Sequence, residues 1–69
     1  MSERENLVKM ANQIADNFAY HDDAVTRTVD HLQRFWAPSM RTRLAEITRD
    51  KGNGLNPVAR AAAGGLDDG

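Results

Sequence analysis

The stretch FWAPSMR, Phe35–Arg41, decides where the chain turns. Pro38 has no backbone N–H to donate and disfavours helical geometry at Ala37, so a helix that reaches Trp36 must stop or kink sharply there. Proline is well tolerated at the first position of a helix, so a new helix can begin at once. Two large aromatic side chains flanked by arginines are costly to leave exposed. We therefore predict that a partner binds at this corner.

Upstream of the corner, the sequence predicts a first amphipathic helix. Ser2 and Glu5 fit a capping box, in which the serine side chain accepts from the backbone N–H of the glutamate, so the helix should begin there. It should end near Ala19 or Tyr20. Its apolar residues recur at spacings of three and four and so share one stripe: Leu7, Met10, Ala11, Ile14, Ala15 and Phe18.

A second amphipathic helix should begin at Asp22 and Asp23, because carboxylates accept the free N–H groups of a first turn and complement the helix dipole. Phe35 widens its apolar stripe. The stripe itself runs at steps of four, three and four: Val25, Val29, Leu32 and Trp36.

Downstream of the corner, the pattern predicts a third helix and a shorter fourth one. Gly52 supplies the left-handed position that commonly ends a helix, and GNGLNP, 52–57, is dense in turn residues. Asn56 could cap a fourth helix through Ala63, where the alanine run favours helix but offers little apolar bulk to anchor it. Gly64 and Gly65 should end this helix, and the tail LDDG, 66–69, should be mobile unless Leu66 packs on something. The third apolar stripe is Met40, Leu44 and Ile47.

Together these elements predict an all-α fold for a single domain, 1–69, with an ordered core over about residues 3–63. It is expected to be a small bundle of three amphipathic helices plus a short C-terminal helix and a mobile tail. A chain of 69 residues buries only about 60% of its unfolded surface, so it should be marginally stable alone or depend on docking to another subunit.

Composition excludes several classes of protein. The formal net charge of −1 argues against broad attraction to nucleic acid or to an anionic membrane. No apolar stretch approaches the roughly 20 residues of a membrane span. The absence of cysteine suits a reducing compartment, and the charged amino terminus lacks a secretory signal, so we expect a cytoplasmic protein.

Candidate chemical sites are scarce in the sequence. His21 and His31 are ten residues apart in the sequence, without the i, i+4 pairing or the cysteine cluster that metal ligation favours. Gly52 and Gly54 form no phosphate-binding loop, because the required lysine followed by serine or threonine is missing. We therefore predict no catalytic, cofactor-binding or metal-binding residue in this chain.

The predicted site is a partner interface. In this interpretation Phe35 and Trp36 provide anchor area, while Arg34 and Arg41 contact a partner's carboxylates in bidentate fashion. A solvated helix face is the competing interpretation of the arginines, and the chain's own core is the competing interpretation of the methionines. The interface residues are predicted to be Met10, Arg34, Phe35, Trp36, Pro38, Met40, Arg41 and Leu55.

Three segments carry a resemblance to a known family: LVKMANQIADNFA (7–19), VDHLQRFWAPSMR (29–41) and GNGLNPVARAA (52–62). In combination they resemble the delta subunit of soluble NAD-dependent, molybdenum-containing formate dehydrogenase. The resemblance covers Leu7 to about Ala63, and its most specific parts are MANQIA (10–15) and the FWAPSMR corner.

The resemblance implies an accessory chain of a cytoplasmic enzyme that oxidises formate to carbon dioxide and passes the electrons to NAD. It places molybdopterin guanine dinucleotide, iron-sulfur clusters and FMN in the larger subunits. This chain would dock on the large catalytic subunit and, through it, on the rest of the complex. Two alternatives stay open: a helix-turn-helix DNA binder that reads DNA with Pro38 to Lys51, and a free-standing homodimeric helical bundle.

Overall fold

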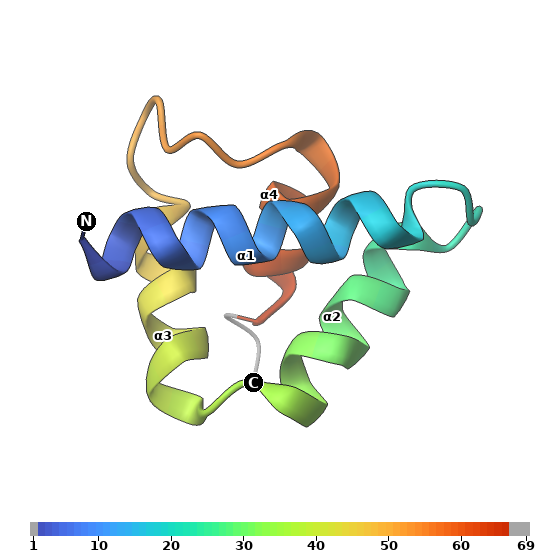
Figure 1. Cartoon of the computed structure of the whole chain (residues 1–69), viewed down its shortest axis with the longest axis horizontal. Coiled ribbons are helices and arrows are strands. Elements are labelled where there is room, and N and C mark those ends of the chain that lie inside the picture. The colour runs from blue at the N-terminus through green and yellow to red at the C-terminus, as the bar shows by residue number, and fades with distance from the viewer. Residues whose placement is uncertain (1, 67–69) are drawn as a thin grey trace.

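The computed structural model describes residues 2–66, and within them helices joined by loops are the only regular secondary structure. Four helices follow one another: α1 (Glu3–Phe18), α2 (Ala24–Phe35), α3 (Pro38–Ile47) and α4 (Pro57–Gly65). In Figure 1, α1 runs along the length of the molecule, α2 and α3 meet at a corner below it, and α4 lies behind it. The all-α prediction is confirmed. The predicted mobile tail falls largely on residues 67–69, outside the described part of the chain.

Helix α1 begins and ends close to where its sequence predicts. The Ser2 side chain accepts a hydrogen bond from the Glu5 backbone N–H at 3.1 Å, which satisfies one of the free donors of the first turn. The helix ends at Phe18, one residue short of the expected end. Leu7, Ala11 and Ala15 are buried. Within residues 2–66, no helix combines the length and the apolar character needed to cross a membrane.

Helix α2 begins as predicted, but Asp23 stabilises its first turn in a different way. Its carboxylate makes no capping bond to the backbone and instead accepts from Arg27 Nε at 2.7 Å. This hydrogen bond holds the pKa of the Asp23 carboxyl below its ordinary value. The first turn is thus fixed by an i, i+4 ion pair on its outer surface.

The buried face of α2 matches the predicted stripe only in part, because Leu32 and Trp36 are buried and Val29 packs partly on the core, but Val25 does not. Ala24, Thr28 and Leu32 are buried, whereas Val25 is exposed and Val29 is half-buried. The small side chains lie where neighbouring helices approach, and the Thr28 hydroxyl donates to the Ala24 carbonyl at 2.8 Å, so that its buried polar group is satisfied. Valine is more hydrophobic than alanine and threonine, but the narrow space between the helices accommodates the smaller side chains.

Helix α3 begins at Pro38 as predicted but is shorter than expected. It ends at Ile47, and Gly52 lies in the following loop, not at the end of the helix. Gly52 and Gly54 have φ values of +70° and +83°, the left-handed conformation that glycine adopts without strain. The two glycines therefore turn the loop and do not terminate α3.

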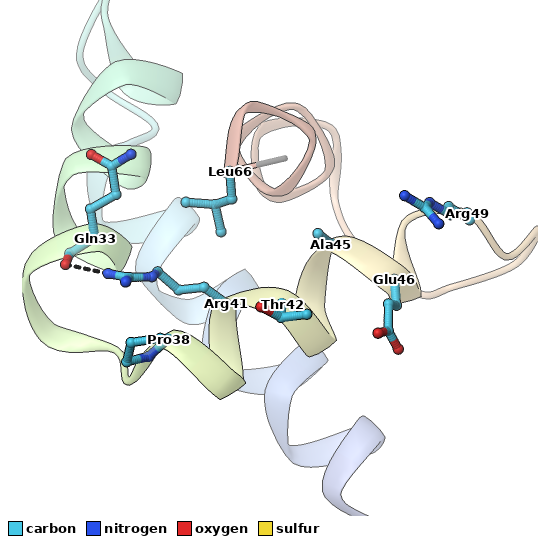
Figure 2. A pocket seen from close by; sticks show the side chains of 8 residues that line it. All are labelled: Gln33, Pro38, Arg41, Thr42, Ala45, Glu46, Arg49 and Leu66. Atoms are coloured by element: carbon cyan, nitrogen blue, oxygen red, sulfur yellow. Dashed lines mark hydrogen bonds between the residues drawn. The ribbon is translucent and has the colours of Figure 1, made fainter. Parts of the chain in front are cut away.

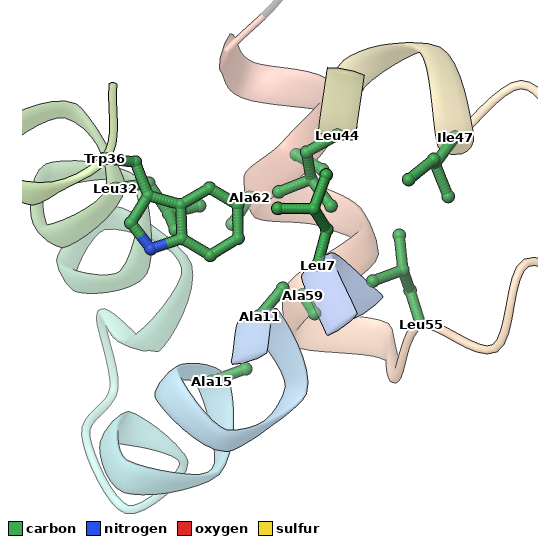
Figure 3. Close-up of a cluster of buried hydrophobic side chains, with 11 residues drawn as sticks. Leu7, Ala11, Ala15, Leu32, Trp36, Leu44, Ile47, Leu55, Ala59 and Ala62 are labelled. Carbon is green, nitrogen blue, oxygen red and sulfur yellow. The ribbon is translucent and has the colours of Figure 1, made fainter. Parts of the chain in front are cut away.

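Helix α4 is capped as predicted. Its alanines anchor it in the core, although the sequence predicted too little apolar bulk for this. The Asn56 side chain accepts from the Ala59 N–H at 2.7 Å. Ala59, Ala62 and Ala63 are almost completely buried, because small side chains let the α4 backbone approach the other helices closely. Leu66, just beyond the helix, packs partly on the core. The buried cluster comprises Leu7, Ala11, Ala15, Leu32, Trp36, Leu44, Ile47, Leu55, Ala59, Ala62 and Ala63 (Figure 3).

A pair of asparagines ties α4 and its preceding loop to the middle of α1. Asn12 donates from Nδ2 to the Gly54 carbonyl at 3.0 Å and accepts at Oδ1 from the Asn56 N–H at 2.9 Å. Asn56 in turn donates to the Asn12 carbonyl and to Asp16 Oδ1. These bonds, here called the asparagine clasp, set where α4 begins relative to α1.

Replacing Ala62 with leucine should destabilise the fold by about 1–3 kcal/mol, because the added atoms have no space between the helices. Ala61→Leu is the matched control, since Ala61 is exposed on the same helix and its change should stay within about 0.5 kcal/mol. Urea unfolding followed by circular dichroism measures both. Equal destabilisation by the two changes would contradict close packing of α4.

Replacing Asn12 with alanine should cost about 1–3 kcal/mol, because the Asn56 N–H and the Gly54 carbonyl lose their partner. The exposed neighbour Gln13→Ala serves as the control and should change the free energy of unfolding little. Thermal unfolding of the two variants tests this. An unchanged midpoint for Asn12→Ala would show that the clasp contributes nothing to stability.

Candidate partner interface

The corner between α2 and α3 is a short extended connection. Trp36 and Ala37 have ψ values of 142° and 149°, so the chain leaves helical geometry for these two residues before Pro38 begins α3. The Trp36 N–H still donates to the Leu32 carbonyl at 3.0 Å, which closes the last turn of α2. The predicted turn at Pro38 is therefore confirmed.

Several predicted interface residues belong to the chain's own core. Trp36 is 6% exposed and Leu55 is 4% exposed. Figure 3 shows the Trp36 ring directed inward, toward Ala62 and Leu44. Met40 is half-buried against the same cluster. Trp36 and Leu55 are therefore buried within this chain, and their predicted contact with a partner stays a prediction.

Phe35 points the other way. It is 71% exposed at the end of α2, although it is one of the largest apolar side chains in the molecule. Its ring contacts the His31 ring at a centroid distance of 4.7 Å, and His31 contacts Phe18 of α1 at 6.1 Å. Phe18 also contacts His21, at 6.2 Å. We call these four side chains, Phe18, His21, His31 and Phe35, the aromatic strip.

The sequence alone predicts only one contact of the aromatic strip. His31 and Phe35 are four residues apart on one helix, a spacing that makes them neighbours. Phe18 belongs to another helix, and its contact with His31 depends on how α1 crosses α2. From the sequence alone, Phe18 belongs to the apolar stripe of the first helix, and His21 and His31 are ten residues apart with no predicted contact between them.

The arginines at the corner are engaged within the chain. Arg34 pairs with Asp30 at 3.0 Å, and Arg41 donates to the Gln33 carbonyl near the end of α2. The Arg34 pair lies at the surface, where such pairs contribute little to stability. Arg41 holds the start of α3 against the end of α2 (Figure 2). The predicted bidentate contacts of Arg34 and Arg41 with a partner stay predictions.

A groove lies beside α3, and Phe35 is not among the residues that line it. It has a volume of about 600 Å³ and is lined by Gln33, Pro38, Arg41, Thr42, Ala45, Glu46, Arg49 and Leu66. Figure 2 shows Leu66 entering it from the end of α4, above Arg41. Gln33 and Phe35 are two positions apart and so point about 200° apart around the helix. Phe35 therefore does not line the groove that contains the predicted interface residues Pro38 and Arg41.

The remaining predicted contact residue, Met10, is 39% exposed on α1. Among residues 2–66 there is no group of three or more His, Cys, Asp or Glu side chains that could hold a metal ion. At the corner between α2 and α3, the most exposed large apolar side chain is Phe35, at 71%.

One comparison with known proteins gives a match. A family model described as the NADH-dependent formate dehydrogenase delta subunit FdsD matches residues 6–63, from the first turn of α1 into the buried alanines of α4. No curated protein and no solved structure matches the chain.

Trp36→Ala and Phe35→Ala should differ sharply, although the two residues are adjacent. Removing the buried Trp36 ring should cost about 3–5 kcal/mol, because it leaves a cavity in the core. Removing the exposed Phe35 ring should cost at most about 1 kcal/mol, the value of its ring contact. Circular dichroism during thermal unfolding measures both. A larger loss for Phe35→Ala would contradict the orientation of the corner.

Proposed function

The chain belongs to the family of delta subunits of NADH-dependent formate dehydrogenase, and from this premise we propose that it is a non-catalytic accessory subunit of that enzyme. In this proposal it docks on the large catalytic subunit and stabilises the complex or assists its assembly. The family match carries the proposal, because it extends across most of the chain and includes the corner, the asparagine clasp and the buried face of α4.

The residue inventory supports a role outside the chemistry. The sequence contains no cysteine, so it has none of the thiolates that hold most iron-sulfur clusters. We place molybdopterin guanine dinucleotide, the iron-sulfur clusters and FMN in the larger subunits, where formate would be oxidised to carbon dioxide and NAD reduced. The delta subunit would then act in the cytoplasm as a structural component.

The size of the core supports a need for a partner. Alanine supplies much of the core among the described residues, and the larger buried apolar side chains are Leu7, Leu32, Trp36, Leu44, Ile47 and Leu55. A partner that binds only the folded state stabilises it by about 2.7 kcal/mol when its concentration is one hundred times Kd. For a chain this small, such a gain is a large share of the total stability.

The helix-turn-helix alternative gains no support from the structure. In that interpretation Arg41 and Arg43 of α3 would contact phosphates or bases. Arg41 instead donates to the Gln33 carbonyl. The Arg43 guanidinium pairs with two carboxylates, with Nε 3.8 Å from Glu3 Oε1 and Nη1 3.9 Å from Glu46 Oε2. Both arginines therefore stabilise contacts between parts of this chain.

The proposal predicts that the tagged chain, produced with the other subunits, co-purifies with the large catalytic subunit in fixed proportion. The bound chain should also unfold at a higher temperature than the isolated one, because binding stabilises the folded state. Size-exclusion chromatography with mass spectrometry measures the first and calorimetry the second. Elution of the chain alone, beside an assembled enzyme, would refute the proposal.

A second measurement separates stabilisation from assembly. The enzyme is produced without the delta subunit, and the yield and molybdenum content of the large subunit are determined. If the chain assists assembly, molybdenum content should fall and purified chain added later should not restore it. If it only stabilises, molybdenum per subunit should be unchanged while the yield or thermal stability falls. Unchanged yield, stability and molybdenum content would contradict both roles.

A further inference from the structure

We propose that the aromatic strip is the surface through which this chain contacts a larger subunit of formate dehydrogenase. The matching surface of that subunit is an apolar hollow, without charged groups placed opposite the charged residues of α2. This inference rests on the proposed function, because it names the contact surface of the same accessory subunit. It differs from the interface expected from sequence, in which arginine–carboxylate pairs and Trp36 had leading roles.

The first observation is that Phe35 is exposed and that its ring contacts a half-buried neighbouring ring. Its ring is 71% exposed, and the His31 ring lies against it at 4.7 Å. His31 is half-buried and leans on Phe18 of α1 at 6.1 Å. A large apolar ring that packs on a neighbour with one part and exposes the rest can bury the exposed part against a partner, as anchor residues do.

The second observation is that the Asp and Arg side chains of α2 and of its N-terminal cap are paired with one another. The Asp and Arg residues of α2 and its cap form two i, i+4 pairs, Asp23–Arg27 at 2.7 Å and Asp30–Arg34 at 3.0 Å. A partner surface gains little from charges placed opposite such closed pairs, since it would have to displace the existing contacts. Recognition should therefore depend on apolar burial and be insensitive to salt.

A larger subunit fits the strip better than a second copy of this chain does. An aromatic side chain buries about 150–250 Å², so Phe35 and the half-buried members together expose roughly 300 Å². A stable interface buries about 800 Å² per partner, so the strip needs a partner that also covers its surroundings. The groove that a second copy offers beside α3 is lined by Arg41, Glu46 and Arg49, and this charged lining is unsuited to a phenylalanine ring.

Full-length tagged variants produced with the other subunits test the inference. Phe35→Asp and Phe35→Ala should reduce the recovered large subunit at least about tenfold, the usual effect of losing an anchor residue. Phe35→Leu, which keeps apolar bulk, should retain more of it. Tyr20→Ala is the matched control, because Tyr20 is an aromatic residue that is 95% exposed and makes no ring contact of the strip; recovery should stay within about twofold.

Two further measurements define the chemistry of the contact. Arg34→Ala, and washing at 0.5 M instead of 0.1 M salt, should each change recovery of the large subunit less than threefold, because Arg34 is paired internally. Circular dichroism of each isolated variant shows whether it is folded. His31→Ala should also lower recovery while leaving the helical content intact, since it removes the support of the Phe35 ring.

The outcomes separate this inference from the proposed function. If the unaltered chain recovers no other subunit, the proposed function itself fails. If the unaltered chain binds and folded Phe35→Asp binds equally well, the strip is not the contact surface although the accessory role stands. A stable dimer of the isolated chain that Phe35→Asp dissociates would identify a second copy as the occupant and overturn the inference. Loss of binding at 0.5 M salt or with Arg34→Ala would overturn its apolar chemistry.

Discussion

The close approach of α4 to the other helices is the constraint on which the rest of this structure depends. Ala59, Ala62 and Ala63 are almost completely buried because they carry only a methyl group each. Larger residues on this face would push α4 away from α1 and α2. The asparagine clasp supports the same geometry from the loop side, since Asn12 binds both the loop carbonyl of Gly54 and the N–H of Asn56. A small chain thus gains a dense core from small side chains.

The position of α4 explains how the corner is oriented. The Trp36 ring fills space against Ala62 and the leucines (Figure 3). Consecutive residues at a helix end point about 100° apart, so a Trp36 directed inward leaves Phe35 on an outer flank of α2. There the ring meets His31, which meets Phe18 of α1. The same packing that encloses the tryptophan therefore creates the exposed aromatic strip proposed to contact a larger subunit.

Local chemistry made some features predictable from single residues. The Ser2 and Asn56 caps and the helix start at Pro38 follow from hydrogen bonding and ring geometry within a few positions. The predicted end of α3 was wrong, because Gly52 turns a loop instead of ending the helix. The predicted stripe of α2 was right for Leu32 and Trp36, but it included the exposed Val25 and missed the buried Ala24 and Thr28. Both features depend on parts of the chain that are distant in sequence. The path of the loop after α3 determines where that helix ends, and the space between α2 and its neighbouring helices determines which α2 side chains are buried.

By itself, the sequence determined the helical class, the turn at Pro38 and the family, because each of these depends on neighbouring residues or on combined short segments. Only the tertiary structure decided which aromatic residue of the corner faces inward. Periodicity places Phe35 and Trp36 on adjoining parts of one stripe, and both are large and apolar. The choice between them depends on the size of the side chains across the interface, where alanines of α4 leave room for an indole ring.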